Sequence, residues 1–326
     1  MKVAGSSGRF FHAHFPPLFR RCHASPFAPF AGRLDGAHAP RVARETGDAS
    51  EEKTLNTDVP KWLVRTAALA AGLTLLAGCA IDKGSALAAD FEEHWADTAD
   101  VAEIDTYGAN TLPFMGSATG TLILEDGTSA DRVAELANEL GAYVADNCEV
   151  TGEITAEGVT FAVAPDSGRT GQVVEMWESL TADDRVSSGA IDIGFQNEDS
   201  WTIEITAADG SGAMAVFNEM AADTDPYRPF SSATVTTLEV STVQGAPTSL
   251  RVATDNEGRV PAAAIAAYEA VAAQYTVVGG ALLSEHGTER ASIVVATGAD
   301  AAHADELARS AAPGLTDLEV TVESGN

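Results

Sequence analysis

Short stretches in which apolar and polar residues alternate recur from residue 89 to the end of the chain. Such alternation is typical of β-strands that bury one face. One set of stretches starts at intervals of about 40 residues and comprises 119–125, 158–163, 201–206, 249–253 and 292–296. A second set lies between them and comprises 148–154, 190–195, 234–240, 280–284 and 318–322. The pattern therefore predicts strands in a repeated arrangement.

Between the two strands of each repeat, apolar residues recur every three or four positions, as on one side of a helix. The clearest stripe consists of Val133, Leu136, Leu140 and Val144. Segments rich in Asp, Ser and Gly precede the helices and are typical of helix starts; they are 127–129, 166–168, 209–212, 256–258 and 298–300. Pro261 suits a first helical position, where its missing N–H costs nothing. Each repeat is thus predicted to be a β-α-β unit.

Short polar segments, such as 156–158 and 286–289, join consecutive units and have the length of hairpin turns. Two joined units have the order β-α-β-β-α-β, which is that of the split, ferredoxin-like arrangement. The predicted fold class is therefore α/β (α+β): tandem βαβ units that form ferredoxin-like modules, with antiparallel sheets and helices packed on one face. This fold supports many functions and indicates none of them by itself.

The order of units predicts three modules in the second part of the chain. Residues 88–156 form an incomplete ferredoxin-like module, because 89–110 supply a helix and a strand but no first strand. Residues 157–244 and 245–326 form complete modules. The other pairing of units remains open: it joins the two middle sets, and the incomplete first unit and the last unit complete each other.

Charge is distributed unevenly along the chain. The first 78 residues contain 10 Lys and Arg against 6 Asp and Glu, while the rest contains 9 against 42, a net charge near −33. A body this acidic is repelled by phosphate backbones and by anionic lipid headgroups. We therefore expect no nucleic-acid partner, and any attachment to a membrane requires something other than electrostatic attraction.

The segment Leu76-Ala77-Gly78-Cys79 ends an apolar run, 66–78, that follows the cations Lys61 and Arg65. A basic region, a short apolar region and small residues before a cut are typical of an export signal. The run of 13 residues is shorter than the roughly 20 that span a bilayer as a helix. With its cysteine, the segment resembles the lipobox of bacterial lipoproteins. The resemblance covers about residues 59–80 only.

The resemblance implies that the signal is cleaved after Leu76, Ala77 and Gly78, and that Cys79 carries the lipid and becomes the first residue of the mature protein. Residues 59–78 are then a lipoprotein signal peptide, and residues 79–87 read as a tether to the folded body. Residues 1–58 are either a disordered extension or the product of a misassigned start codon. The lipid anchor would place the body at the extracytoplasmic face of the bacterial cell membrane, since two or more acyl chains bind a bilayer stably.

The mature part shows no strong catalytic or metal-binding motif, and we expect no cofactor and no metal site. Cys148 has no cysteine left to pair with and reads as a small buried residue. His94, His286 and His303 read as surface residues, although Asp300 and His303 share a helix face. The turns at 209–212 and 298–300 follow strands as phosphate loops do, but lack the full fingerprint and read as capping turns.

These observations favour a non-catalytic binding or scaffold lipoprotein of the cell envelope, with an envelope protein or polymer as its partner. Two alternatives remain. One is an envelope hydrolase that uses a pair of carboxylates in a cleft. The other is a cation-binding lipoprotein, for which the acidic pairs Asp183-Asp184 and Asp223/Asp225 are candidates.

Overall fold

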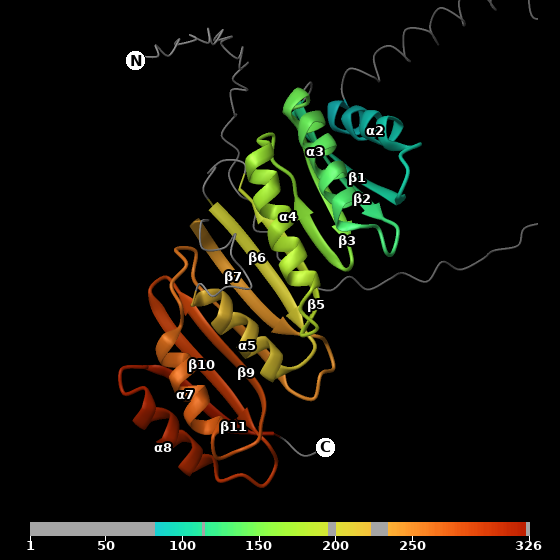
Figure 1. The fold of residues 1–326 in the computed structure, drawn as a ribbon. Helices are drawn as coiled ribbons and strands as arrows, with labels where there is room; N and C mark the ends of the chain where they lie inside the picture. Colours follow the sequence, from blue (N-terminus) through green and yellow to red (C-terminus); the bar gives the residue numbers. More distant parts are fainter. Residues whose placement is uncertain (1–81, 113–114, 195–199, 223–233, 324–326) are drawn as a thin grey trace, which may run out of the picture. The chain divides into compact units, whose positions relative to one another are not determined.

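The computed structural model describes residues 82–112, 115–194, 200–222 and 234–323 (Figure 1). The helices of this part are α2 (Lys83–Trp95), α3 (Ala130–Asp146), α4 (Ser167–Thr181), α5 (Gly210–Ala221), α7 (Ala262–Ala272) and α8 (Ala301–Ala311). The strands are β1 (Val101–Leu112), β2 (Met115–Leu124), β3 (Val150–Ala156), β4 (Val159–Ala162), β5 (Val186–Ile193), β6 (Ser200–Ala207), β7 (Thr234–Thr242), β8 (Ser249–Ala253), β9 (Val277–Glu285), β10 (Thr288–Val295) and β11 (Asp317–Val322). The predicted repeat of strands and helices is confirmed.

All of these strands belong to one sheet of 11 strands, and their order in the sheet is their order in the chain. Strands joined by a hairpin pair antiparallel, as β3 does with β4. Strands joined through a helix pair parallel and lie directly side by side, as β2 and β3 do. The sheet is therefore mixed, and parallel and antiparallel pairs alternate from β1 to β11.

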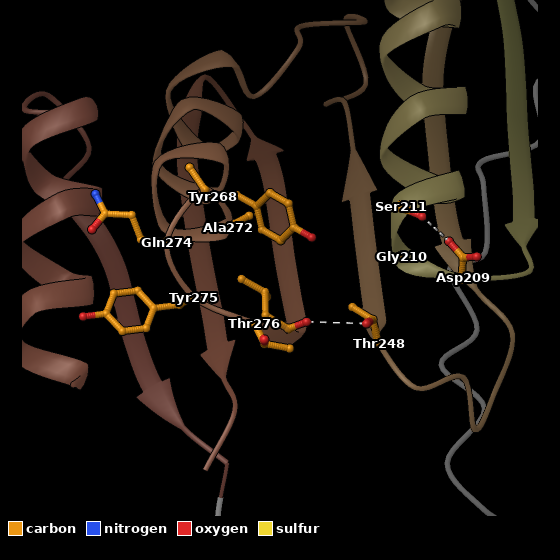
Figure 2. Close-up of a pocket in the computed structure, with 11 residues that line it drawn as sticks. Asp209, Gly210, Ser211, Thr248, Tyr268, Ala272, Gln274, Tyr275 and Thr276 are labelled. Atoms are coloured by element: carbon orange, nitrogen blue, oxygen red, sulfur yellow. Dashed lines mark hydrogen bonds between the residues drawn. The ribbon is translucent and has the colours of Figure 1, made fainter. Parts of the chain in front are cut away.

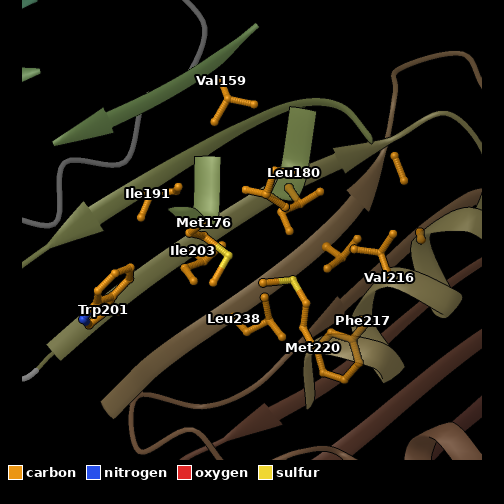
Figure 3. Packing of buried hydrophobic residues seen from close by; sticks show 14 of the residues in the cluster. Val159, Met176, Leu180, Ile191, Trp201, Ile203, Val216, Phe217, Met220 and Leu238 are labelled. Carbon is orange, nitrogen blue, oxygen red and sulfur yellow. The ribbon is translucent and has the colours of Figure 1, made fainter. Parts of the chain in front are cut away.

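One face of the sheet is apolar and carries the helices (Figure 1). A continuous row of opposed residues crosses seven strands on this face and consists of Ile104, Leu122, Ile154, Phe161, Ile191, Ile203 and Leu238. The helices pack onto such rows; Met176 and Leu180 of α4 lie over Ile191 and Ile203 (Figure 3). Residues on the other face of the sheet are mostly polar, and within the described part no helix covers them.

Two hairpins turn within two residues. Glu157 and Gly158 join β3 to β4 with φ angles of 50° and 78°, and His286 and Gly287 join β9 to β10 with 50° and 79°. Positive φ at both central residues defines a type I′ turn, whose twist matches that of paired strands. The hairpin connections predicted at these positions are confirmed.

The helix starts follow the predicted capping residues. The side chains of Ser129, Asp166 and Asp300 accept hydrogen bonds from backbone N–H groups in the first turns of α3, α4 and α8. Pro261 precedes the first helical residue of α7 rather than occupying it. Glu289 of β10 provides the cap there, because its Oε2 accepts from the N–H groups of Ala263 and Ala264 at 2.7 and 3.1 Å.

The ferredoxin-like modules are not confirmed. In the split arrangement another strand separates the two strands of each βαβ unit, whereas here those two strands are neighbours. The expectation of purely antiparallel sheets was wrong for the same reason. The sheet also continues through the expected module boundaries at 156/157 and 244/245, because β3 pairs with β4 and β7 pairs with β8.

This strand order has a consequence for the handedness of the crossovers. Strand direction reverses at every hairpin, so the β2–β3 and β4–β5 units run in opposite directions while both advance across the sheet in the same sense. If both crossovers had the same handedness, α3 and α4 would lie on opposite faces of the sheet. Since both helices cover the same face, consecutive crossovers alternate in hand, and at least two of the five are left-handed, a connection found in about 2% of βαβ units.

Helix α2 begins at Lys83, inside the range 79–87 that the sequence analysis interpreted as a tether, so residues 83–87 are helical. Asp82 caps this helix by accepting from the N–H of Ser85 at 3.2 Å. The helix packs on β1 and β2 through glycines: a Cβ at Gly84 would lie 2.5 Å from the carbonyl oxygen of Ala109. The sequence did not indicate the glycine contacts, because they are made by backbone atoms; the side chains of Phe91 and Trp95 are buried beside them.

Candidate functional site

The residues proposed for lipid attachment and signal cleavage, Cys79, Leu76, Ala77 and Gly78, lie outside the described residues. The described part of the chain follows them closely and begins at Asp82. A search of the described residues finds no helix long and apolar enough to cross a membrane. The sites that the structure itself presents are therefore in the folded body.

A cavity of about 540 Å³ lies between α5 and α7 and opens beside β8 and β9 (Figure 2). Its lining includes Asp209 and Ser211 at the start of α5, Thr248 before β8, and Tyr268 on α7. Gly210 lets α5 approach the β7–β8 connection, since a Cβ there would lie 2.6 Å from Cγ2 of Thr248. The cavity is thus a gap between two helices that are held apart by the strands beneath them.

Tyr268 points from α7 into this cavity, with its hydroxyl directed toward Asp209 and Ser211 (Figure 2). The residue is 9% exposed, and burial raises the pKa of its phenol above the ordinary value. Its ring packs over β9, where a Cβ at Gly280 would lie 3.8 Å from Cδ2 of Tyr268. Tyr268 belongs to the buried stripe of α7, together with Ile265 and Val271. The only sequence signal of a polar site here is the tyrosine hydroxyl in an otherwise alanine-rich helix.

At the far end of the cavity, Tyr275 interacts with a histidine. The hydroxyl of Tyr275 lies 2.7 Å from Nδ1 of His303, which is on α8. His303 is exposed, as predicted, and its own N–H donates to Asp300 at 3.1 Å as part of the helix cap. Asp300 therefore caps the start of α8, and the backbone N–H of His303 is one of the groups that it caps.

The turn 209–212 is a capping turn, as the sequence indicated. Oδ1 of Asp209 accepts from the N–H of Gly212 at 2.8 Å and from the hydroxyl of Ser211 at 2.6 Å. The Ser211 hydroxyl and the backbone donors lower the pKa of Asp209 below its usual value. A negatively charged carboxylate at this helix start repels a phosphate.

A second candidate is a pair of carboxylates on the open face of the sheet. Glu153 of β3 lies opposite Ala162 of β4, and Asp192 of β5 lies on the other side of β4. Burial raises the pKa of Glu153, the hydroxyl of Thr121 opposes that shift by donating to Oε2 at 3.0 Å, and the charge of Asp192 adds to it. Desolvation also raises the pKa of Asp192, although that residue remains exposed.

Substitution of Glu153 by Gln should stabilise the fold at neutral pH by on the order of 0.5 kcal/mol. The raised pKa means that the folded state binds a proton more readily than the unfolded state, so the contribution of Glu153 becomes less favourable as pH rises past the ordinary value of 4.5. Urea unfolding of Glu153→Gln should show a gain at pH 7.5 and none at pH 3.5. The exposed carboxylate Glu103 on β1 supplies the control, and an equal gain in Glu103→Gln would contradict this explanation.

Of the acidic residues proposed as calcium ligands, Asp183 forms hydrogen bonds with an arginine. Asp183 accepts from Nη2 of Arg185 at 2.6 Å, and the same guanidinium donates to Glu219 of α5 at 2.6 Å. These bonds tie the α4–β5 connection to α5 and raise the pKa of Arg185. Asp223 and Asp225 lie outside the described residues. Across the described ranges, no three His, Cys, Asp or Glu side chains gather to hold a metal.

The remaining candidates from the sequence are one cysteine and two histidines. Cys148 is exposed and unpaired, so the expectation that it is buried was wrong. His94 is exposed on α2, and its ring contacts Trp95 edge-on and Tyr143 at a tilt, at ring-centroid distances of 5.1 and 4.7 Å. His286 is exposed in the type I′ turn.

Comparison with known proteins gives no further assignment. No family model matches the chain, and neither a curated protein nor a solved structure matches it. The functional interpretation therefore follows from the residues of this chain alone.

Proposed function

We propose that this protein is a bacterial lipoprotein, anchored through Cys79 at the extracytoplasmic face of the cell membrane, and that it acts there as a non-catalytic binding or scaffold protein of the cell envelope. The single observation that carries the proposal is the lipobox Leu76–Cys79 at the end of a short apolar run that follows Lys61 and Arg65. The partner is an envelope protein or polymer.

Two features of the folded body support this role. Only two residues lie between Cys79 and Asp82, the first described residue, so an acylated Cys79 would hold the body close to the bilayer. The body carries strong negative charge, which makes a covalent anchor necessary for stable attachment. A broad open sheet face and an interhelical cavity provide surfaces for binding.

Substitution of Cys79 by Ser should abolish lipid attachment and leave an uncleaved precursor. The thiol is the acceptor for the lipid, and a serine hydroxyl is a poor substitute for it. Expression in a bacterium with metabolic labelling by a fatty acid should show label in the parent protein and none in Cys79→Ser. Detergent-phase partitioning should change from the detergent phase to the aqueous phase.

Cys148 provides the matched control, because it is the exposed cysteine of the folded body. Cys148→Ser should keep the label and the detergent partitioning of the parent. Unchanged processing in Cys79→Ser, or loss of label in Cys148→Ser, would refute the assignment of the anchor.

The pair Glu153 and Asp192 favours one second candidate, a hydrolase that uses two carboxylates. Burial raises the pKa of both carboxyl groups, which is the direction that a general acid requires. They lie on an open sheet face rather than in a deep cleft, which makes this candidate the weaker one. Hydrolysis of a wall glycan that is lost in both Glu153→Gln and Asp192→Asn, while both variants remain folded, would favour it.

A further inference from the structure

Strand β1 forms one edge of the sheet, because among the described strands it pairs with β2 alone. We propose that this edge binds an extended segment of another protein as an added strand, and that the segment carries Lys or Arg at alternate positions. The proposal names a class of partner for the binding role given above and rests on that role. It does not depend on the lipid anchor, because β1 belongs to the folded body.

The repeat of the fold has a parallel strand on this side of β1. In each βαβ unit a helix joins two parallel strands that lie side by side, as α3 joins β2 to β3. Helix α2 packs on β1 and β2 and precedes β1 just as α3 precedes β3 (Figure 1). In the described part of the chain, however, no strand pairs with the outer side of β1. The backbone N–H and C=O groups on that side can therefore pair with an added strand.

The apolar layer beneath the helices is incompletely covered at this edge. Ile104 begins the apolar row that continues through Leu122 and Ile154. The latter two are fully buried, whereas Ile104 is only half-buried. Leu87 of α2 and Val101 of β1 are partly buried as well. An added strand would place every second side chain on this side of the sheet, where an apolar residue would continue the row.

The side chains of β1 on the open face select the charge of the partner. Glu103, Asp105 and Tyr107 follow one another at alternate positions of this face, and all three are exposed. Within the described residues, neither carboxylate forms an ion pair, and Tyr107 is 71% exposed. Opposite charges on neighbouring strands stabilise a sheet, and a cation also binds over a tyrosine ring. The matching segment therefore alternates basic and apolar residues.

A second copy of the chain fits this edge less well than a basic segment does. Pairing of β1 with β1 of another copy would bring Glu103 and Asp105 close to the same carboxylates of that copy. Like charges on neighbouring strands are destabilising. The other edge strand, β11, carries Asp317 and Glu319 and presents the same difficulty. Charge therefore favours a basic partner over self-association.

The probe is the fluorescently labelled peptide acetyl-TRVRVRT-amide, titrated against the full-length protein. Fluorescence anisotropy measures the affinity, and hydrogen exchange locates the binding. We expect saturable binding that slows the exchange of residues 101–112 and leaves residues 317–322 unchanged. The acidic analogue acetyl-TEVEVET-amide should not bind. The basic peptide with all of its backbone nitrogens methylated keeps its charges but cannot donate to a strand, so it should bind at least about tenfold more weakly.

Glu103→Gln combined with Asp105→Asn removes both charges from β1 and should weaken binding of the basic peptide by about tenfold. Asp317→Asn combined with Glu319→Gln is the matched control, because it removes two exposed charges with the same spacing from the other edge strand. Asp317 already lies 3.6 Å from Nε of Arg290. The control should leave the affinity within about twofold of the parent. Circular dichroism of both variants establishes that the fold is retained.

The proposal would be overturned by equal binding of the methylated peptide, which would indicate general attraction to an acidic protein. The same loss of affinity in both double variants, or no binding of the basic peptide, would overturn it too. Protection of residues 101–112 that increases with protein concentration, without any peptide, would identify a second copy as the occupant instead. None of these results affects fatty-acid labelling at Cys79, so the failure of this proposal can be distinguished from failure of the anchor.

Discussion

Replacing Gly84 by Ala is expected to weaken the docking of α2 on the sheet by about 1–3 kcal/mol. The added Cβ would lie 2.5 Å from the carbonyl oxygen of Ala109, which is backbone and has no rotamer to relax into. The contact is tight from the other side as well, because a Cβ at Gly108 would lie 2.5 Å from the backbone of Gly84. Hydrogen exchange of the amides of residues 83–95 should become faster in Gly84→Ala.

The direction of this effect is informative, because alanine favours helix formation over glycine by up to about 1 kcal/mol. Gly171 provides the matched control within α4, since no heavy atom lies within 4 Å of a Cβ built there. Gly171→Ala should therefore stabilise its helix, while Gly84→Ala destabilises the packing of α2. If the two variants changed stability in the same direction in urea unfolding, the close approach of α2 to β1 would be refuted.

The docking of α2 also determines how far the body can move from the proposed anchor. The three residue steps from Cys79 to Asp82 reach about 10 Å when fully extended. With α2 released from the sheet and unfolded, the chain from Cys79 to Val101 would reach about 70 Å. A lipoprotein with α2 docked would therefore act within a short distance of the bilayer, and Gly84→Ala would lengthen that reach.

The sequence was sufficient to predict the local elements, because each depends on neighbours along the chain. The alternation in β6 and the stripe of α3 are properties of short windows, and the capping residues act within one turn. Strand order depends instead on contacts between distant segments. The row from Leu122 to Ile203 would be apolar in either order, since both orders bury the same residues beneath the helices. Periodicity therefore could not distinguish the sequential sheet from ferredoxin-like modules.

The candidate sites likewise divide into one that local sequence indicates and one that depends on contacts between distant segments. The lipobox is a linear pattern and can be read from the sequence alone. The cavity at Tyr268 cannot, because its walls come from α5, α7 and the connection before β8, which are more than 50 residues apart at their extremes. Tyr268 occupies a position of the apolar stripe that packs on the sheet, and only the gap beside α5 gives its hydroxyl an open space to face.

The strand order leads to a test with an all-or-none result. Thr160 of β4 and Ala190 of β5 lie opposite each other on neighbouring parallel strands and share the open face of the sheet. Neighbouring strands are about 4.8 Å apart, which is within the Cα separation that a disulfide requires. In a ferredoxin-like module β6 would lie between these strands and separate the two positions by about 10 Å, beyond the reach of a disulfide.

We therefore expect Thr160→Cys combined with Ala190→Cys to form a disulfide on mild oxidation, in full-length protein whose own cysteines, Cys22, Cys79 and Cys148, are replaced by Ser. Mass spectrometry of proteolytic peptides under non-reducing conditions would identify the linked pair. Ala190→Cys with Glu204→Cys is the matched control, because β5 and β6 are hairpin partners in both arrangements. If the control pair is linked and the Thr160/Ala190 pair is not, the sequential strand order is wrong. The alternation of left- and right-handed crossovers would then be wrong as well, because it follows from that order and from the helices lying on one face.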